Sequence, residues 1–333
     1  MKPHLLFVAE KWCDCNPNCG PTNNEHNLCG SFKSSLLGTH DVFYGDEYFL
    51  LHDLACDEAL VNKCTDSPPD ILVLSWFPRY PMYPKLETLN LIRSKLQIPM
   101  VAIWFDTVAD CVMDWAESVV PFIDLNVVLD STTAYLKRTN QPEKYLPMWT
   151  PQDPCLFSNP NLNRDIGISL VGSRSGRPDR LAGIRALQQN GINLYQKGGQ
   201  REERVSVEEY ALLYKRSQIA LNFGTAQSQY KGRIFEATLC GAMLLESENP
   251  ETAKWFEPMV DYVPFTGEAD LVDKAKYYLE HEAERMSIAA NGHQKAQEKY
   301  TGYTFWKTIL CKINMMPKLP QLQFLGKREF EIF

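Results

Sequence analysis

The sequence predicts an α/β protein with two doubly wound domains, each built on a parallel sheet between helices. Short apolar runs alternate with segments long enough to form helices, which is typical of parallel sheets. The alternation stops at a stretch rich in proline and asparagine and then begins again. The 333 residues, of which 44% are hydrophobic and 23% charged, are enough for two separate cores.

The first alternation covers residues 1–155, which we expect to form the N-terminal domain. Residues 5–9 form a continuous apolar run between polar segments, as a buried strand requires. Further strands are expected at residues 41–44, 71–75, 100–105 and 125–129, and a helix at residues 25–37. The prolines and asparagines of residues 148–163 favour a connection between domains.

The second alternation covers residues 156–305, which we expect to form the C-terminal domain. Strands are expected at residues 166–171, 192–195, 219–223 and 242–245, and helices at residues 179–190 and around 271–279. Ser206 followed three residues later by Glu209 predicts a capping box at the start of a further helix.

Overall charge excludes some classes of partner. A net charge of −7 argues against a broad nucleic-acid-binding face, although a local basic site stays possible.

No apolar run approaches the roughly 18 residues of a membrane span, and the first residues turn polar too soon for a signal peptide. We therefore expect a cytoplasmic protein with no membrane span.

Ten cysteines, without a secretion signal, are expected to be mostly free thiols. Cys13, Cys15, Cys19 and Cys29 form the one cluster with enough sulfur atoms for zinc. Their spacing lacks the paired C-x2-C units of structural zinc sites, so no metal is predicted there.

The most informative segment is residues 231–246, with the sequence KGRIFEATLCGAMLLE. Its apolar residues predict a short buried helix, yet Glu236 lies among them, and a buried carboxylate is costly without a partner. Gly241 is expected to end the helix in the left-handed conformation.

Three segments carry a resemblance to group 1 glycosyltransferases, and specifically to the CgeB-like, spore-maturation branch: residues 207–223, 231–246 and 278–292. The resemblance implies the GT-B architecture, in which two Rossmann-like domains face a cleft. It also implies that residues 306–333 cross back to the N-terminal domain. The implied donor is a nucleoside diphosphate sugar, most often UDP- or GDP-linked, with no cofactor and no metal required.

The expected donor site lies in the C-terminal domain. In open α/β sheets, ligands bind beyond the carboxyl ends of the strands. The turn after residue 171 offers backbone amides and guanidinium groups for a diphosphate, and its candidate residues are Gly172, Ser173, Arg174, Arg177 and Arg180. The resemblance implies that Glu236 holds the ribose and that Lys231 and Arg233 neutralise the leaving phosphates. Asn222 ends a strand and is expected to contribute its amide.

The expected acceptor site lies in the N-terminal domain. Glu10 and Lys11 follow the first strand, and Trp76 follows another. Asp106 and His26 are candidate general bases, since an inverting transfer needs a group that accepts the proton of the attacking hydroxyl. A retaining transfer needs no such base, and the two residues would then orient substrate.

Alternatives stay open at this level. The wider retaining family places a second glutamate eight residues before the first, where this chain has Ser228. This departure favours a second hypothesis, a nucleotide-sugar-binding or assembly protein that has lost catalysis. A dinucleotide-binding oxidoreductase is excluded because no G-x-G-x-x-G follows the first strand. The acceptor could be a polysaccharide, a protein, a metabolite or a modified nucleobase.

Overall fold

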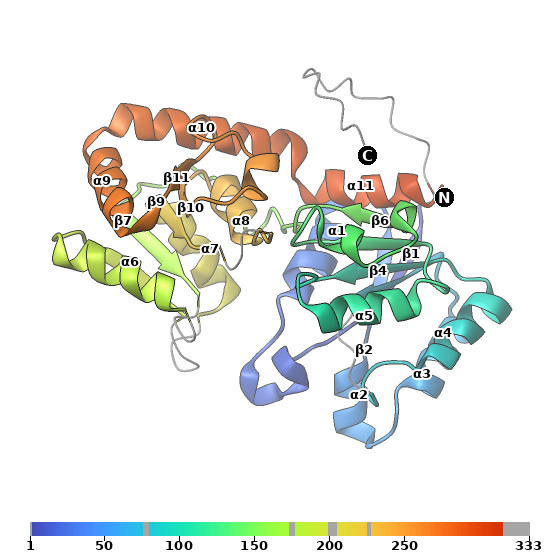
Figure 1. Ribbon diagram of the computed structural model, residues 1–333. Coiled ribbons are helices and arrows are strands. Elements are labelled where there is room, and N and C mark those ends of the chain that lie inside the picture. Colours follow the sequence, from blue (N-terminus) through green and yellow to red (C-terminus); the bar gives the residue numbers. More distant parts are fainter. Residues whose placement is uncertain (1, 76–79, 173–176, 199–204, 225–227, 316–333) are drawn as a thin grey trace.

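The computed structural model describes residues 2–75, 80–172, 177–198, 205–224 and 228–315. Within these ranges the chain forms two parallel sheets that lie side by side, each with its own helices (Figure 1). No helix in the described ranges is long and apolar enough to cross a membrane. The predicted α/β class with two doubly wound domains is confirmed.

The first sheet has six parallel strands in the order β2-β1-β3-β4-β5-β6. Their bounds are β1 His4–Ala9, β2 Thr39–Tyr44, β3 Ile71–Ser75, β4 Met100–Trp104, β5 Leu125–Val128 and β6 Tyr145–Pro147. The α-helices are α1 Ser31–Ser35, α2 Gly45–His52, α3 Asp57–Asp66, α4 Leu86–Leu91 and α5 Asp110–Val119. Shorter helical turns are η1 Cys13–Cys15, η2 Pro17–Cys19, η3 Glu25–Gly30, η4 Ile92–Leu96, η5 Ala134–Lys137 and η6 Pro142–Lys144.

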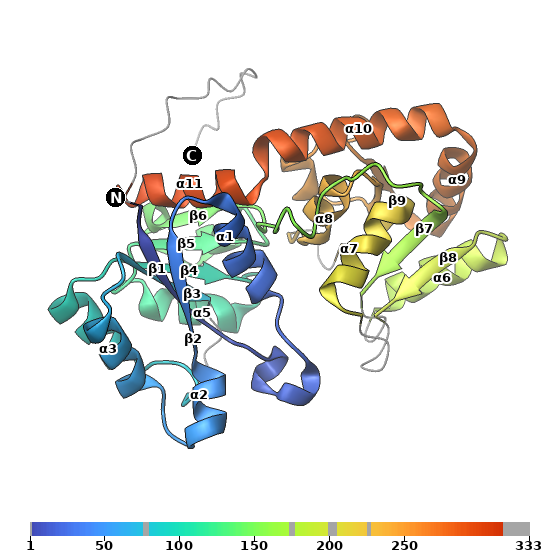
Figure 2. The same ribbon diagram turned by 180° about the vertical axis from the view of Figure 1, so that it is seen from behind.

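Both faces of the first sheet are buried, as a doubly wound sheet requires. Along β1, Leu5 and Phe7 pack on the face that α1 covers, whereas Leu6 and Val8 pack on the face that α3, α4 and α5 cover. Figure 1 shows α5 in front of the sheet, and the opposite view in Figure 2 shows α1 there. This alternation explains why the strand is a continuous apolar run.

The second sheet has five parallel strands in the order β11-β10-β9-β7-β8. Their bounds are β7 Ile166–Val171, β8 Leu194–Lys197, β9 Ser217–Asn222, β10 Met243–Ser247 and β11 Val263–Phe265. The helices are α6 Pro178–Gln189, α7 Val207–Arg216, α8 Arg233–Leu239, α9 Gly267–Glu280 and α10 Glu282–Lys299, with the turn η8 Thr252–Lys254. Helices α6 and α9 pack on one face of the sheet, and α7, α8 and α10 on the other.

A half-buried arginine and several aromatic side chains hold the segment between the sheets. Arg164 donates to the carbonyls of Ser217 at 2.6 Å and Cys240 at 2.7 Å, so it caps the carboxyl ends of α7 and α8. Trp149 lies against the rings of Trp255 and Tyr300. Because these contacts join the connecting segment to the second sheet's helices, they fix how that segment leaves the first sheet.

The chain returns to the first sheet at α11, Gly302–Lys312, which packs against α1. Trp306 is fully buried, and its indole nitrogen donates to Ser31 Oγ at 2.8 Å. Its ring meets those of Phe7, Phe32 and Phe305 edge-on. The predicted return of the C-terminal segment is confirmed for α11, while residues 316–333 lie outside the described ranges.

Local expectations hold where a single residue determines the backbone. Ser206 and Glu209 form the predicted capping box at the start of α7. Gly241 has φ +73°, and a Cβ there would lie 2.5 Å from Asn159 Nδ2, so only glycine fits.

The short strands β6 and β11 were not predicted, and β8 begins two residues later than expected. Each of these strands has half-buried positions, so its apolar pattern is weak.

We predict that Trp306→Ala lowers the free energy of unfolding of the first domain by about 3–5 kcal/mol, because the change removes a buried indole and leaves a cavity. Tyr303→Ala on the same helix is the matched control, since that side chain is 45% exposed. Guanidinium unfolding followed by tryptophan fluorescence measures both changes. Equal losses in the two variants would contradict the packing described for α11.

Candidate functional site

The candidate site lies where the carboxyl ends of the two sheets meet. Residues that follow β4 and β5 contact residues that follow β9 and β10. In parallel α/β sheets this edge is where ligands bind. Two polar groups of residues lie here: an arginine cluster at the end of β7, and a network of carboxylates and amides between the domains.

The arginine cluster surrounds Gly172, the first residue after β7. Gly172 has φ +124°, and a Cβ there would lie 2.7 Å from Arg233 Nη2 and 3.3 Å from Arg180 Nη1. Gly198, which follows β8, has φ +82° and lies against the Gly172 backbone, because a Cβ on it would lie 3.2 Å from the nitrogen of Gly172. Gly172 therefore leaves room for two guanidinium groups, and Gly198 lets the end of β8 lie close to the Gly172 backbone.

Like charges are crowded in this cluster. Arg180 is buried, and burial together with the positive charges of Arg233 and Arg177 lowers its pKa to about 10. Its guanidinium also lies over the ring of Phe223. Arg177 donates to the carbonyl of Gly224 at 2.6 Å and pairs with Asp179. An anion bound among these groups would relieve their mutual repulsion. Ser173 and Arg174 lie outside the described residues.

Glu236 is buried on α8, as its sequence context predicted. The Tyr210 hydroxyl donates to Glu236 Oε2, and Gln152 Nε2 lies 3.5 Å from Oε1. Burial raises the pKa of Glu236, and the hydrogen bond from Tyr210 and the charge of Arg233 oppose that rise. The carboxylate thus has polar partners that a ligand's hydroxyl groups can replace.

A second buried carboxylate, Glu246 on β10, lies next to Asn222 on β9. Asn222 Nδ2 donates to Glu246 Oε1 at 2.7 Å, and both side chains are almost fully buried. Burial raises the pKa of Glu246 to about 7, and Thr252, Asn222 and Arg233 oppose that rise. Asn222 was expected to offer its amide to the donor, but the structure shows that nitrogen hydrogen-bonded to Glu246.

Asp106 follows β4 and faces the other domain. Its φ is +56°, a conformation that aspartate tolerates better than most residues. Its Oδ1 accepts from Gln229 Nε2 at 2.9 Å and from Lys231 Nζ at 3.1 Å. Two sequence-predicted residues, Asp106 and Lys231, are thereby brought into direct contact.

His26 lies elsewhere at the interface between the domains. Its ring packs on Phe157 with 5.8 Å between centroids. Burial lowers the pKa of His26 to about 4, and Asp153 and Glu208 oppose that change. The imidazole is therefore neutral at pH 7 and buried, among neighbours different from those of Asp106.

The expected acceptor residues lie in the loop after β1. Lys11 Nζ pairs with Glu47, and its backbone amide donates to Asp46. The carbonyl of Glu10 accepts from Thr22 Oγ1 at 2.9 Å, and its carboxylate lies 3.6 Å from the sulfur of Cys15. These contacts order the loop. Trp76 lies outside the described residues.

Sequence reasoning missed several residues of the site. Asp130 follows β5, so the strand-end rule could have found it. Gln229 and Tyr210 carry no comparable signal, because nothing in the sequence says that one contacts Asp106 and Asp130 and the other Glu236.

None of the ten cysteines, all of which lie in the described ranges, is joined in a disulfide bond. Within the described ranges no three or more histidine, cysteine, aspartate or glutamate side chains are grouped so as to hold a metal ion.

Residues 164–310 match a protein family described as glycosyl transferase-like. No curated protein matches the chain in sequence. The match covers the second sheet, α11 and the arginine cluster, and so includes every element that carries the candidate donor site.

Solved structures share the two-sheet architecture. HepE from Anabaena, in complex with UDP-glucose, is similar with a TM-score of 0.63 and 14% identity over 94% of this chain and 100% of that one. A glycosyltransferase from Rickettsia africae has a TM-score of 0.63 and 11% identity over 96% and 100% of the two chains. Sucrose-phosphate synthase from Thermosynechococcus elongatus has a TM-score of 0.61 and 11% identity over 94% and 98%. The chain therefore has the GT-B fold.

We predict that Glu246→Gln flattens the dependence of stability on pH. Between its ordinary pKa of 4.5 and the raised value of about 7, the folded protein keeps a proton that the unfolded chain releases. The free energy of unfolding of the wild type therefore falls as pH rises through this range, by on the order of 3 kcal/mol at most.

Urea unfolding at pH 5 and pH 8 measures this difference in Glu246→Gln, in the wild type and in Glu280→Gln, whose side chain is exposed. The control should follow the wild type. An unchanged pH dependence in Glu246→Gln would contradict the assignment.

Proposed function

We propose that the protein transfers a sugar from a nucleoside diphosphate sugar to an acceptor hydroxyl. The observation that carries this proposal is the crowding of Arg180 and Arg233 around Gly172, with Glu236 buried one helical turn from Arg233. A diphosphate matches the guanidinium groups and a ribose diol matches the carboxylate. The GT-B fold and the glycosyl transferase-like match over residues 164–310 support the same function.

In the proposed donor complex, the diphosphate binds at Gly172 between Arg180 and Arg233, with Arg177 at the rim. The two ribose hydroxyls donate to Glu236 in place of Tyr210 and Gln152. When the bond from sugar to phosphate breaks, negative charge grows on the leaving diphosphate. Fixed guanidinium groups that already lie there stabilise the charge without further reorganisation.

Asp106 is the proposed group on the acceptor side. It comes from the opposite domain and touches Lys231, two residues before Arg233, so it lies close to the donor's phosphates. In an inverting reaction its carboxylate would accept the proton of the attacking hydroxyl. His26 is the weaker candidate, because it is buried against Phe157 and its pKa is low. Glu10, Lys11 and Trp76 remain proposed acceptor contacts.

The family branch, the use of a metal, the location and the donor nucleotide are finer parts of the proposal, each with its own support. Membership of the CgeB-like branch rests on residues 205–300. Transfer without a metal is proposed because arginine side chains can neutralise the diphosphate. A cytoplasmic location stays a prediction. UDP is the first donor nucleotide to test, because the similar HepE structures hold UDP and UDP-glucose, and GDP is the second.

The alternative, a binding protein without catalysis, rests on Ser228. This residue is exposed next to Gln229 and offers a hydroxyl where the wider family has a carboxylate. The two functions differ in one respect: both predict nucleotide binding, but only the first predicts turnover.

We predict that UDP or GDP raises the melting temperature of the wild type, since a ligand that binds only the folded state stabilises it. Glu236→Ala should weaken the binding about 10- to 100-fold, because it removes both acceptors of the ribose hydroxyls. Glu280→Gln is the control. Thermal shift and isothermal titration calorimetry measure the effect, and undiminished affinity in Glu236→Ala would refute the ribose assignment.

We predict that Arg233→Ala lowers kcat for sugar transfer or donor hydrolysis about 100-fold and changes the dissociation constant of the nucleotide far less. The reason is that the charge on the leaving group is largest in the transition state. Single-turnover kinetics with UDP-glucose separates the two quantities. A wild type that binds UDP but turns over none of the common UDP or GDP sugars would favour the alternative.

A further inference from the structure

Lys231 is shared by two parts of the structure that have different roles. It belongs to the loop before α8, two residues ahead of Arg233, on the proposed phosphate side. Yet its ammonium group pairs with Asp106, which belongs to the other domain, at 3.1 Å. In this structure a carboxylate of the first domain therefore holds one of the cations that are proposed to bind the donor's diphosphate.

Asp106 has other contacts that keep it in place without Lys231. Gln229 Nε2 donates to Asp106 Oδ1 at 2.9 Å and to Asp130 Oδ2 at 2.9 Å. Thr107 Oγ1 donates to the other oxygen of Asp130 at 2.6 Å. Gln229 is almost completely buried, whereas the Asp106 side chain is 60% exposed. Loss of Lys231 as a partner would thus leave Asp106 oriented and open to another ligand.

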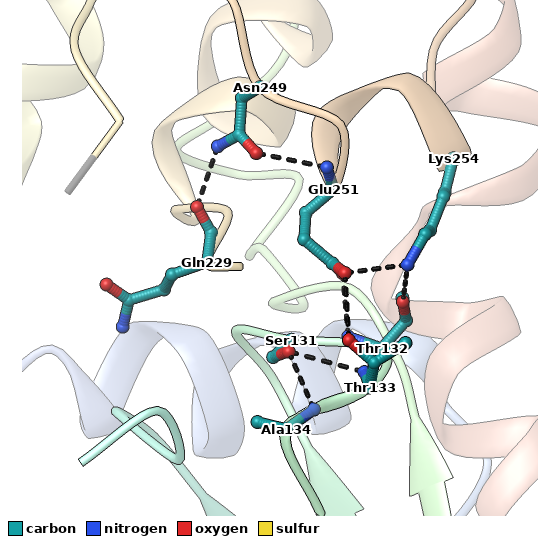
Figure 3. Close-up of polar contacts among 8 residues, drawn as sticks. All are labelled: Ser131, Thr132, Thr133, Ala134, Gln229, Asn249, Glu251 and Lys254. Carbon is teal, nitrogen blue, oxygen red and sulfur yellow. Dashed lines mark hydrogen bonds and ion pairs between the residues drawn. The ribbon is translucent and has the colours of Figure 1, made fainter. Parts of the chain in front are cut away.

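The loop backbone on the Lys231 side is also held. The amide of Tyr230 donates to the carbonyl of Asp130 at 2.8 Å, and its hydroxyl donates to the carbonyl of Met148 at 2.5 Å. The carbonyl of Gln229 accepts from Asn249, whose oxygen accepts from the amide of Glu251 (Figure 3). The side chain of Lys231 is therefore the part of this loop that is free to rotate in the proposed exchange.

The same network ties the second domain to the loop after β5. Glu251 accepts from the backbone amide of Thr132 at 2.8 Å, and Lys254 pairs with Glu251 at 2.6 Å, as Figure 3 shows. Because these contacts involve neither Lys231 nor Asp106, they can hold the two loops together while that ion pair opens.

We propose that Lys231 exchanges Asp106 for the donor's diphosphate, so that donor binding releases the Asp106 carboxylate toward the acceptor hydroxyl. This inference rests on the proposed function. It implies that the donor binds first and that the Oδ1 atom of Asp106 stays paired with Lys231 until it does. No covalent bond changes in the exchange. A half-exposed ion pair is weak, and a diphosphate carries at least two negative charges, so the diphosphate wins the competition.

The test is calorimetric titration with UDP and, as a probe without a base, with inorganic pyrophosphate. Asp106→Asn should bind both about two- to five-fold more tightly than the wild type, because it removes the competing charge. Asparagine still accepts from Gln229 and tolerates the positive φ. Asp114→Asn is the matched control, since Asp114 pairs with Arg138 at the same 3.1 Å on the surface of the same domain.

The Lys231→Met background separates competition from a general charge effect. Lys231→Met alone should lower the affinity for pyrophosphate. Adding Asp106→Asn to Lys231→Met should not raise that affinity again. Three results would overturn the inference while leaving the proposed function intact: no gain in Asp106→Asn, an equal gain in the Lys231→Met background, or no loss in Lys231→Met. Absence of both UDP and GDP binding in the wild type and in every variant would instead overturn the proposed function.

Discussion

The second domain depends on one electrostatic constraint, the placing of Arg180 and Arg233 side by side at the end of β7. Their charges repel, and burial of Arg180 adds a cost. Two buried carboxylates, Glu236 and Glu246, offset part of this positive charge. Such an arrangement stabilises a fold less than apolar packing would. Its position at the carboxyl edge of a parallel sheet, where ligands bind in such folds, supports the proposed role in binding the donor's diphosphate.

The surrounding structure follows from that constraint. Gly172 and Gly198 have φ +124° and +82°, which favour glycine, and a Cβ on Gly172 would displace the guanidinium of Arg233. Glu246 shares a hydrogen bond with Asn222 because a carboxylate inside a sheet needs a donor from the next strand. The charge of Arg233 acts on both Glu236 and Glu246 and opposes the rise of their pKa values. The cluster therefore extends from the surface turn into the core.

The sequence predicted the features that short-range chemistry determines. The apolar runs of β1, β3 and β4, the capping box at Ser206 and the left-handed Gly241 all follow from local pattern. So does the burial of Glu236, because its neighbours are apolar. The partners of these residues were not predictable. Gln229 reaches Asp106 and Asp130 across more than 90 residues, and Tyr210 reaches Glu236 from another helix, so only the packed fold brings them together.

The central claim is that the carboxyl edge of the second sheet binds a nucleoside diphosphate through the arginine cluster and Glu236. A crystal structure of the protein with UDP tests it most directly. The account predicts phosphates beside Gly172 within hydrogen-bond distance of Arg180 and Arg233, and both ribose hydroxyls on Glu236. A nucleotide bound elsewhere, or one whose ribose does not touch Glu236, would contradict it.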